Sequence, residues 1–246
     1  MKKEKNKGKE TQCEQILKKL KSYSNQKNII GMARFGINVK NVFGVTIPVI
    51  RKLAKEIGKN HKLALELWDS EIHEAKILAS IIDEPKLVSE KQLEKWVKDF
   101  DSWDVCDQVC ANLFEYAPFA FKKVVEWTKR KEEFVKRAGF AMMACLAVHD
   151  KKAGDEKFIA FFKYIKKESI DERNFVKKAI NWALRQIGKR NIILNKLTIN
   201  LAEEIFKIES KSAMWIAKDA IRELKSNAVQ KRLFKNPLAP HFLSSP

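Results

Sequence analysis

Two residues that could do chemistry together lie four positions apart in the segment DSWDVCD, residues 101–107. On a helix, Trp103 and Asp107 share one face, so an indole ring and a carboxylate point the same way. Helix capping accounts for the neighbouring polar residues. Ser102 or the acid before it can be the N-cap, and Asp104 lies in the first turn, where negative charge suits the helix dipole. Asp107 lies a full turn deeper, where capping does not apply.

The spacing leaves two interpretations of Asp107 open. A carboxylate on a surface that binds phosphates opposes binding, but it becomes useful where positive charge develops beside it during a reaction. The alternative is a salt bridge from Asp107 to a nearby Lys or Arg, with Trp103 in the core. Cys106 and Cys110 share another face of the same helix and fit an ordinary core.

A second group of candidates lies in the segment FVKKAINWALRQIGK, residues 175–189. Lys178, Trp182 and Arg185 follow one another at spacings of four and three, which makes a cation–aromatic–cation series along one helical face. Cations in such a series suit phosphate contacts, and the ring suits packing against a sugar or base. The alternative is a core tryptophan flanked by solvated cations.

Helices must position these residues. The chain of 246 residues contains only 8 glycines and 6 prolines. Ala, Leu, Lys, Glu and Ile dominate, so the composition favours helices and argues against an all-β fold. The clear loop signal in the first quarter is residues 35–58, where Gly36 and Gly44 permit turns before Pro48 opens a new helix.

An internal repeat organises the second half of the chain. FVKRAGFAMM begins at Phe134, FVKKAINWAL begins at Phe175, and the same offset of 41 residues leads on into WIAKDAIREL, residues 215–224. Two helices in about 40 residues are typical of HEAT and armadillo repeats. We therefore predict an all-α fold, an α-α superhelix (solenoid) of HEAT-like helical repeats, whose concave side offers an extended surface suited to a duplex.

The repeat offset also predicts which residues are equivalent. Arg137 and Lys178 match, so both should face the same side of the solenoid. Small residues that let neighbouring helices pack closely are expected at Ala138, Ala179 and Ala220. The tryptophans expected in the core between repeats are Trp68, Trp96, Trp127 and Trp215.

Positive charge is spread over the whole chain, whose net charge is +18. We expect residues 1–10 to be a disordered basic tail, residues 11–235 a single HEAT-like repeat domain, and residues 236–246 a flexible C-terminal tail. The first tail carries only +3, which leaves +15 on the remainder. Charge of this size on a folded body indicates a polyanionic partner, although a generally lysine-rich proteome would give the same excess.

Composition argues against several other classes of protein. No apolar run approaches the ~18–20 residues needed to span a bilayer, and no apolar stretch follows the first lysines as in a signal peptide. We therefore expect a cytoplasmic protein with no membrane partner. The four cysteines form no CxxC pair, which fits reduced thiols. No His pairs with a Cys at metal-ligand spacing, so we predict no metal and no cofactor.

Over roughly residues 30–225 the chain resembles the DNA alkylation repair proteins, the AlkD-like DNA glycosylases built from HEAT-like repeats. The segments that carry the resemblance are GVTIPVIRKLAKEI (44–57), ELWDSEIHEAKILA (66–79), SWDVCD (102–107), VKRAGFAM (135–142) and FVKKAINWALRQIGK (175–189). The W-D-x-x-D and KAI-x-W-x-LR patterns within them are the more specific signals.

The resemblance implies an enzyme that removes positively charged purines, alkylated at N3 or N7, from duplex DNA by hydrolysing the N-glycosidic bond, as in base excision repair. On the matching positions Asp107 is the catalytic carboxylate. Trp103 and Trp182 embrace the backbone and deoxyribose of the lesion. Arg137 holds phosphate and helps to position Asp107, and Arg185 matches an arginine near the DNA backbone.

The chemistry agrees with these roles. A cationic purine is already a good leaving group, so the enzyme need not protonate it. The remaining task is to stabilise the oxocarbenium-like sugar, which a carboxylate can do while it orients or deprotonates water. Electron-rich indole faces favour the same positive charge. The resemblance also implies that the lesion stays accessible instead of entering a snug pocket.

Two departures from the family pattern stand out. Phe35 lies where relatives often carry a tyrosine near the N-terminal helices, and Ser102 lies where an additional tryptophan can occur. We include Phe35 with Lys178 among the DNA-binding candidates and expect a monomer. Two alternative functions remain open: a non-catalytic binder of damaged or branched DNA on the same scaffold, and a HEAT-repeat scaffold for protein–protein contacts.

Overall fold

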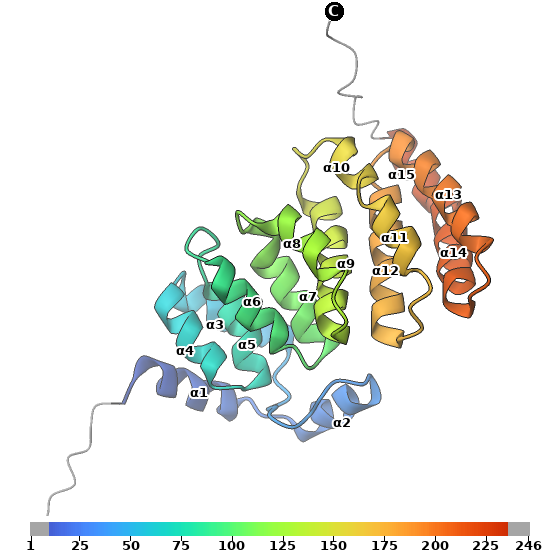
Figure 1. The fold of residues 1–246 in the computed structure, drawn as a ribbon. Coiled ribbons are helices and arrows are strands. Elements are labelled where there is room, and N and C mark those ends of the chain that lie inside the picture. Colours follow the sequence, from blue (N-terminus) through green and yellow to red (C-terminus); the bar gives the residue numbers. More distant parts are fainter. Residues whose placement is uncertain (1–9, 236–246) are drawn as a thin grey trace, which may run out of the picture. The chain divides into compact units, whose positions relative to one another are not determined.

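The computed structural model describes residues 10–235, and all regular structure in this range is helical, with no strand (Figure 1). The all-α prediction is therefore confirmed. The two predicted tails lie outside the described residues, except for Glu10, which pairs with Lys18 at 2.5 Å. Within the same range no helix is long and apolar enough to cross a membrane.

The chain divides after Val88 into two units, each of which is described by itself. The prediction of one repeat domain over residues 11–235 stays a prediction. The helices of the first unit are α1 (Gln12–Ser22), α2 (Gln26–Arg34), α3 (Ile47–Ile57), α4 (His61–Asp69) and α5 (His73–Ile82). Helix α5 packs against α3 and α4, and α1 packs against α4. The core tryptophan of this unit is Trp68, which is buried as predicted.

A buried glutamate fixes the loop between α2 and α3. The carboxylate of Glu74 accepts hydrogen bonds from the backbone N–H groups of Phe43 (3.0 Å), Gly44 (2.6 Å) and Val45 (3.1 Å). Gly44 has φ of 76°, and a Cβ there would lie 2.3 Å from the backbone oxygen of Asn25, so only glycine fits. The predicted turn is confirmed, with Pro48 in the first turn of α3.

The second unit is built from successive helix pairs, which follow one another through the green, yellow and red parts of Figure 1. Its helices are α6 (Glu90–Lys98), α7 (Trp103–Asn112), the short 3₁₀ helix η1 (Phe114–Tyr116), α8 (Ala120–Trp127), α9 (Glu133–His149), α10 (Asp155–Ile159), α11 (Phe162–Glu168), α12 (Asn174–Gly188), α13 (Ile192–Phe206), α14 (Lys211–Leu224) and α15 (Asn227–Lys235). Helices α8, α11 and α13 each pack against the helix that follows them in the chain.

The helices α7, α9, α12 and α14 form a continuous layer, in which each packs against the next; we name them the row helices. Ala138, Ala179 and Ala220 are completely buried within them, as predicted for close helix packing. The predicted core tryptophans Trp96 and Trp127 are also buried, on either side of Phe114 at ring-centroid distances of 6.5 and 5.5 Å.

The prediction that Trp215 lies in the core is wrong, because its side chain is 40% exposed. Small and aliphatic residues already fill the buried face of α14. Those in its first half are Ser212, Ala213, Ile216 and Ala217. Trp215 lies outside this stripe, so its indole remains at the surface.

Candidate functional site

The candidate residues of the second unit lie on three consecutive row helices. Trp103 and Asp107 are the first and fifth residues of α7, Arg137 is the fifth residue of α9, and Lys178 is the fifth residue of α12. The sequence signals set these registers. Ser102 is the N-cap of α7, and Asp104 is in its first turn, as predicted. Because the row helices pack side by side in this order, equivalent positions follow one another across the unit.

Arg137 and Asp107 form a two-pronged ion pair between α9 and α7. Arg137 Nε donates to Asp107 Oδ1 at 3.0 Å, and a terminal nitrogen donates to Oδ2 at 2.7 Å. The other terminal nitrogen donates to the backbone oxygen of Phe175 at 2.5 Å, so one guanidinium ties three row helices together. Paired charged hydrogen bonds of this kind fix geometry as well as charge.

Burial differs between the two partners. The side chain of Arg137 is 7% exposed and that of Asp107 is 19% exposed. Arg137 is therefore the more deeply buried partner, and part of the Asp107 side chain reaches solvent. Trp103 lies beside the pair, with the guanidinium carbon of Arg137 at 5.9 Å from its ring centroid. The salt bridge of the second interpretation is present, although Trp103 is half-buried and not in the core. The catalytic interpretation of Asp107 stays a prediction.

Burial and ion pairing shift the pKa values of Asp107 and Arg137 in opposite directions. Burial raises the pKa of Asp107 above its ordinary value, while the charge and hydrogen bonds of Arg137 act to lower it, and nearby Asp104 raises it further. Burial works against the charge of Arg137, but Asp107 raises the pKa of that guanidinium. Arg137 therefore opposes the effect of burial and favours the charged form of Asp107, while its own guanidinium stays protonated.

The cysteine face of α7 is core, as predicted. Cys106 and Cys110 are fully buried, and their sulfurs lie 3.8 Å from the backbone oxygens of Phe134 and Ala138 on α9. Burial raises the pKa of the Cys110 thiol well above its ordinary value. These thiols pack α7 against α9, and Trp103 and Asp107 lie on the adjacent face of α7.

The cation–aromatic–cation series on α12 is only partly open. Lys178 is exposed and Trp182 is half-buried. Arg185 forms an ion pair with Glu223 on α14, and its Nε lies 3.8 Å from Asp219. Sequence reasoning missed both acids, because they lie on another helix with no local signal to connect them to Arg185.

A polar network also holds Trp182. When the amide of Gln186 is oriented to satisfy its neighbours, its oxygen accepts from Trp182 Nε1 at 3.2 Å and from Lys189 Nζ at 3.1 Å. Lys189 in turn binds Glu223 at 2.6 Å. The indole is thereby tethered by its N–H, which limits the rotation of the ring.

Phe35 belongs to the first unit and is described apart from these residues. It is the C-cap of α2 and 73% exposed. No Asp or Glu occurs in the sequence between Glu14 and Glu56, so the surroundings of Phe35 along the chain are basic. The prediction that Phe35 contacts DNA stays a prediction.

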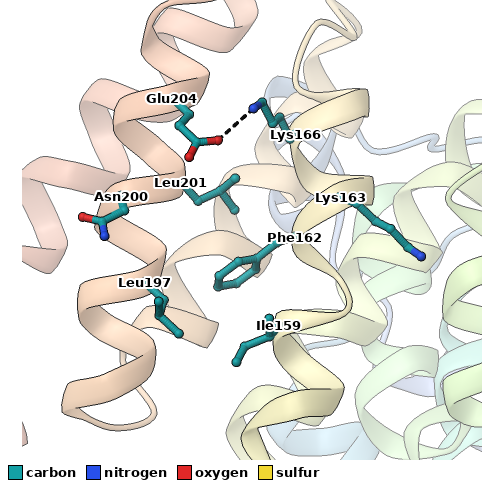
Figure 2. Close-up of a pocket in the computed structure, with 8 residues that line it drawn as sticks. All are labelled: Ile159, Phe162, Lys163, Lys166, Leu197, Asn200, Leu201 and Glu204. Carbon is teal, nitrogen blue, oxygen red and sulfur yellow. Dashed lines mark hydrogen bonds and ion pairs between the residues drawn. The ribbon is translucent and has the colours of Figure 1, made fainter.

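A separate recess of about 410 Å³ lies between α11 and α13 (Figure 2). Phe162 and Leu201 point toward one another across it, and an ion pair of 2.8 Å joins Lys166 to Glu204 at one end. None of the candidate residues lines this recess. Within residues 10–235, no three His, Cys, Asp or Glu side chains are grouped so as to hold a metal ion.

Comparisons with known proteins agree with the fold and the segment order. A family model described as DNA alkylation repair enzyme matches residues 16–227. One solved structure has 20% identity, covers 87% of this chain and 95% of that chain, and has a TM-score of 0.73. It represents a new family of proteins related to the HEAT-like repeat DNA glycosylases, with affinity for branched DNA structures. This likeness confirms the HEAT-like fold.

Other solved structures are less similar. An engineered protein has 13% identity, covers 89% of this chain and 100% of that chain, and has a TM-score of 0.39. A designed armadillo repeat protein in complex with a (KR)4 peptide has 14% identity, covers 76% of this chain and 79% of that chain, and has a TM-score of 0.35. No curated protein matches the chain.

Proposed function

Because the chain belongs to the DNA alkylation repair enzyme family, we propose that it is a DNA glycosylase that excises cationic N3- or N7-alkylated purines from duplex DNA. The observation that carries this proposal is the position of Asp107. Its side chain is 19% exposed, both of its oxygens accept hydrogen bonds from Arg137, and the ring of Trp103 lies 5.9 Å from the same guanidinium.

The proposed reaction needs no metal and no protonation of the leaving group. The bond between C1′ of the sugar and the purine nitrogen breaks, and its electron pair neutralises the positive charge of the base. The sugar becomes an oxocarbenium-like cation, which the Asp107 carboxylate stabilises by its charge. Water then bonds to C1′, and its proton passes to Asp107 or to solvent, which leaves an abasic site.

The remaining candidates grip the DNA. Trp103 and Trp182 offer indole faces to the sugar and backbone of the damaged nucleotide, where each ring favours developing positive charge by about 0.5–2 kcal/mol. Lys178 contacts phosphate from the exposed surface of α12, and Arg185 does so once it leaves Glu223. Arg137 is a positioning residue, because it reaches the reaction through Asp107.

A second candidate function is a non-catalytic binder of branched or damaged DNA. Two observations favour it. Both oxygens of Asp107 already accept hydrogen bonds from Arg137, and the solved structure with the TM-score of 0.73 is from a family with affinity for branched DNA structures. Such a protein would bind DNA with a steep salt dependence but release no base.

The deciding experiment uses duplex DNA with a single N7-methylguanine. The pure protein is incubated with this duplex and with the same duplex carrying guanine, and free base is measured over time. Release from the methylated duplex alone supports the glycosylase. Binding of both duplexes without release supports the second candidate. Failure to bind either duplex at low salt would leave a scaffold for protein–protein contacts.

A further inference from the structure

Trp215 is an exposed aromatic residue that the site on α7, α9 and α12 does not use. It is 40% exposed, and Met214 beside it is 36% exposed. Trp215 is the fifth residue of α14, the same position that Asp107, Arg137 and Lys178 occupy in the three preceding row helices. It therefore continues the row of candidate residues by one helix.

Trp215 lines a recess of about 340 Å³. Its lining residues are Glu172, Lys177, Lys211, Ser212 and Trp215. The hydroxyl of Ser212 donates to the backbone oxygen of Asp171 at 2.7 Å, which fixes the start of α14 against the loop before α12. Lys177 Nζ lies 5.2 Å from the ring centroid of Trp215, so the recess combines an aromatic surface with an adjacent cation.

The charge of the recess selects an anionic partner. Two lysines line it against a single carboxylate, that of Glu172, and the exposed Lys178 lies on the same row as Trp215. Aromatic rings beside cations are the features that hold single-stranded nucleic acids, because bases stack on the rings and phosphates pair with the cations. A base inside a duplex has both faces covered by its neighbours, so an indole stacks more readily on an unpaired base.

We propose that Trp215 stacks on an unpaired base of the DNA bound along the row helices, while Lys177 and Lys211 contact the phosphates of that nucleotide. The proposal rests on the proposed function in so far as DNA is the partner. It gives the protein a preference for DNA in which paired and unpaired strands meet.

The test measures the affinity of the full-length protein for two unmodified labelled DNAs by fluorescence anisotropy. One is a fully paired duplex, and the other is the same duplex with a short single-stranded flap. The variants are Trp215→Ala and Trp215→Phe. A matched control is Tyr164→Ala on α11, which also removes a ring with a lysine over it, Lys163 at 5.1 Å. Thermal unfolding checks that every variant is folded.

The expected result is that Trp215→Ala weakens binding of the flap DNA by about tenfold, since the variant loses the stacking of one base on the indole. Its effect on the paired duplex should be below about twofold. Trp215→Phe should retain most of the flap affinity, and Tyr164→Ala should bind both DNAs like the wild type. Equal losses on both DNAs, or no loss on the flap DNA, would overturn the proposal.

This outcome is separable from that of the glycosylase test, because neither DNA contains a lesion. If no base is released from N7-methylguanine DNA while Trp215→Ala selectively loses flap binding, the proposed reaction fails and the stacking site stands. If base is released and Trp215→Ala binds the flap DNA like the wild type, the proposed reaction stands and the stacking site fails.

Discussion

Arg137 of α9 holds both carboxylate oxygens of Asp107 of α7, at 3.0 and 2.7 Å, and bonds to the backbone oxygen of Phe175 at the start of α12. One side chain therefore fixes both the orientation of the candidate catalytic group and the relative positions of three helices. Since Arg137 is 7% exposed, its charge depends on Asp107 for compensation. Removing either partner leaves the other charge poorly compensated.

Asp107→Asn should lose most base release while it retains DNA binding. The amide carries no charge to stabilise the oxocarbenium-like sugar, so the rate should fall by about 10²–10³-fold, as when a single electrostatic stabiliser is removed from an active site. Base release from N7-methylguanine DNA and affinity for the same duplex are measured side by side.

The matched control for Asp107→Asn is Asp101→Asn, which removes the same charge from an exposed position in the same segment. This control should release base at the wild-type rate. Thermal unfolding must accompany both variants, because Asp107→Asn leaves Arg137 with weaker compensation and should be less stable. Unchanged release by folded Asp107→Asn would remove the carboxylate from the mechanism.

The rate of base release should fall in acid at a higher pH than for an ordinary aspartate. The active form is the carboxylate, and burial raises the pKa of Asp107 while Arg137 opposes this rise. Arg137→Gln removes the opposing charge, so the pKa of Asp107 should rise further and the acid limb of the pH–rate profile should move to higher pH. Arg137→Lys keeps a positive charge and should shift the limb less.

The pH–rate profile distinguishes a positioning role from a purely structural one. A variant that was only less stable would release base more slowly at every pH, and the acid limb of its profile would stay at the wild-type pH. A profile of Arg137→Gln with the wild-type acid limb and a lower plateau would therefore contradict the link between Arg137 and the protonation of Asp107.

The sequence predicted the local features of this protein well. The 3.6-residue pattern and the repeat identified the row helices, and the spacing of Trp103 and Asp107 predicted that an indole and a carboxylate share one face of α7; both are half-buried in the structure. The partner of Asp107 came from family resemblance, since it lies 30 residues away along the chain. Spacing on a single helix carries no information about which neighbouring helix supplies the countercharge.

The wrong prediction for Trp215 arose from the register of α14 relative to the repeat. Helix α14 begins 37 residues after α12, at Lys211 against Asn174, whereas the repeat offset is 41. The difference is about one helical turn. A shift of about one turn leaves each residue on the same face of the helix, so the buried position of Ala220 was predicted correctly. It also matched Trp215 with Asn174 and not with Lys178, which hid the position of Trp215 on the row.

Glu223→Gln should increase affinity for DNA. The change weakens the ion pair that holds Arg185 and frees its guanidinium for a phosphate. One added phosphate contact should steepen the slope of log affinity against log salt concentration by about 0.9. The affinity for a paired duplex is measured at several salt concentrations.

The control for Glu223→Gln is Glu203→Gln, which removes an acid on α13 that pairs at 2.9 Å with Lys225, the residue after α14, without touching Arg185. Adding Arg185→Gln to Glu223→Gln should abolish the gain. Equal gains from the Glu223 and Glu203 variants would show that net charge, and not Arg185, causes the effect.

Lys123→Met should strongly destabilise the second unit at neutral pH. Lys123 is 3% exposed, and its ammonium lies 2.8 Å from Glu90, 2.9 Å from Glu94 and 2.6 Å from Glu126. Its loss leaves three carboxylates without their shared cation. Because these carboxylates are 28–42% exposed and keep Lys122 or Arg130 as partners, the cost should be below the roughly 3–5 kcal/mol of a fully buried pair. Urea unfolding followed by circular dichroism measures the change.

The same substitution should flatten the acid dependence of stability. Burial alone would raise the pKa of Glu94, but hydrogen bonds from Lys123 and Trp127 lower it overall. A carboxyl group whose pKa is lowered by folding adds stability above its ordinary pKa, and this stability is lost as the pH falls through the folded value. Without Lys123, less stability remains to be lost.

Lys122→Met is the matched control, because Lys122 also binds Glu90 but is 57% exposed. This control should change the stability at neutral pH and its acid dependence by no more than about a third of the Lys123→Met effect.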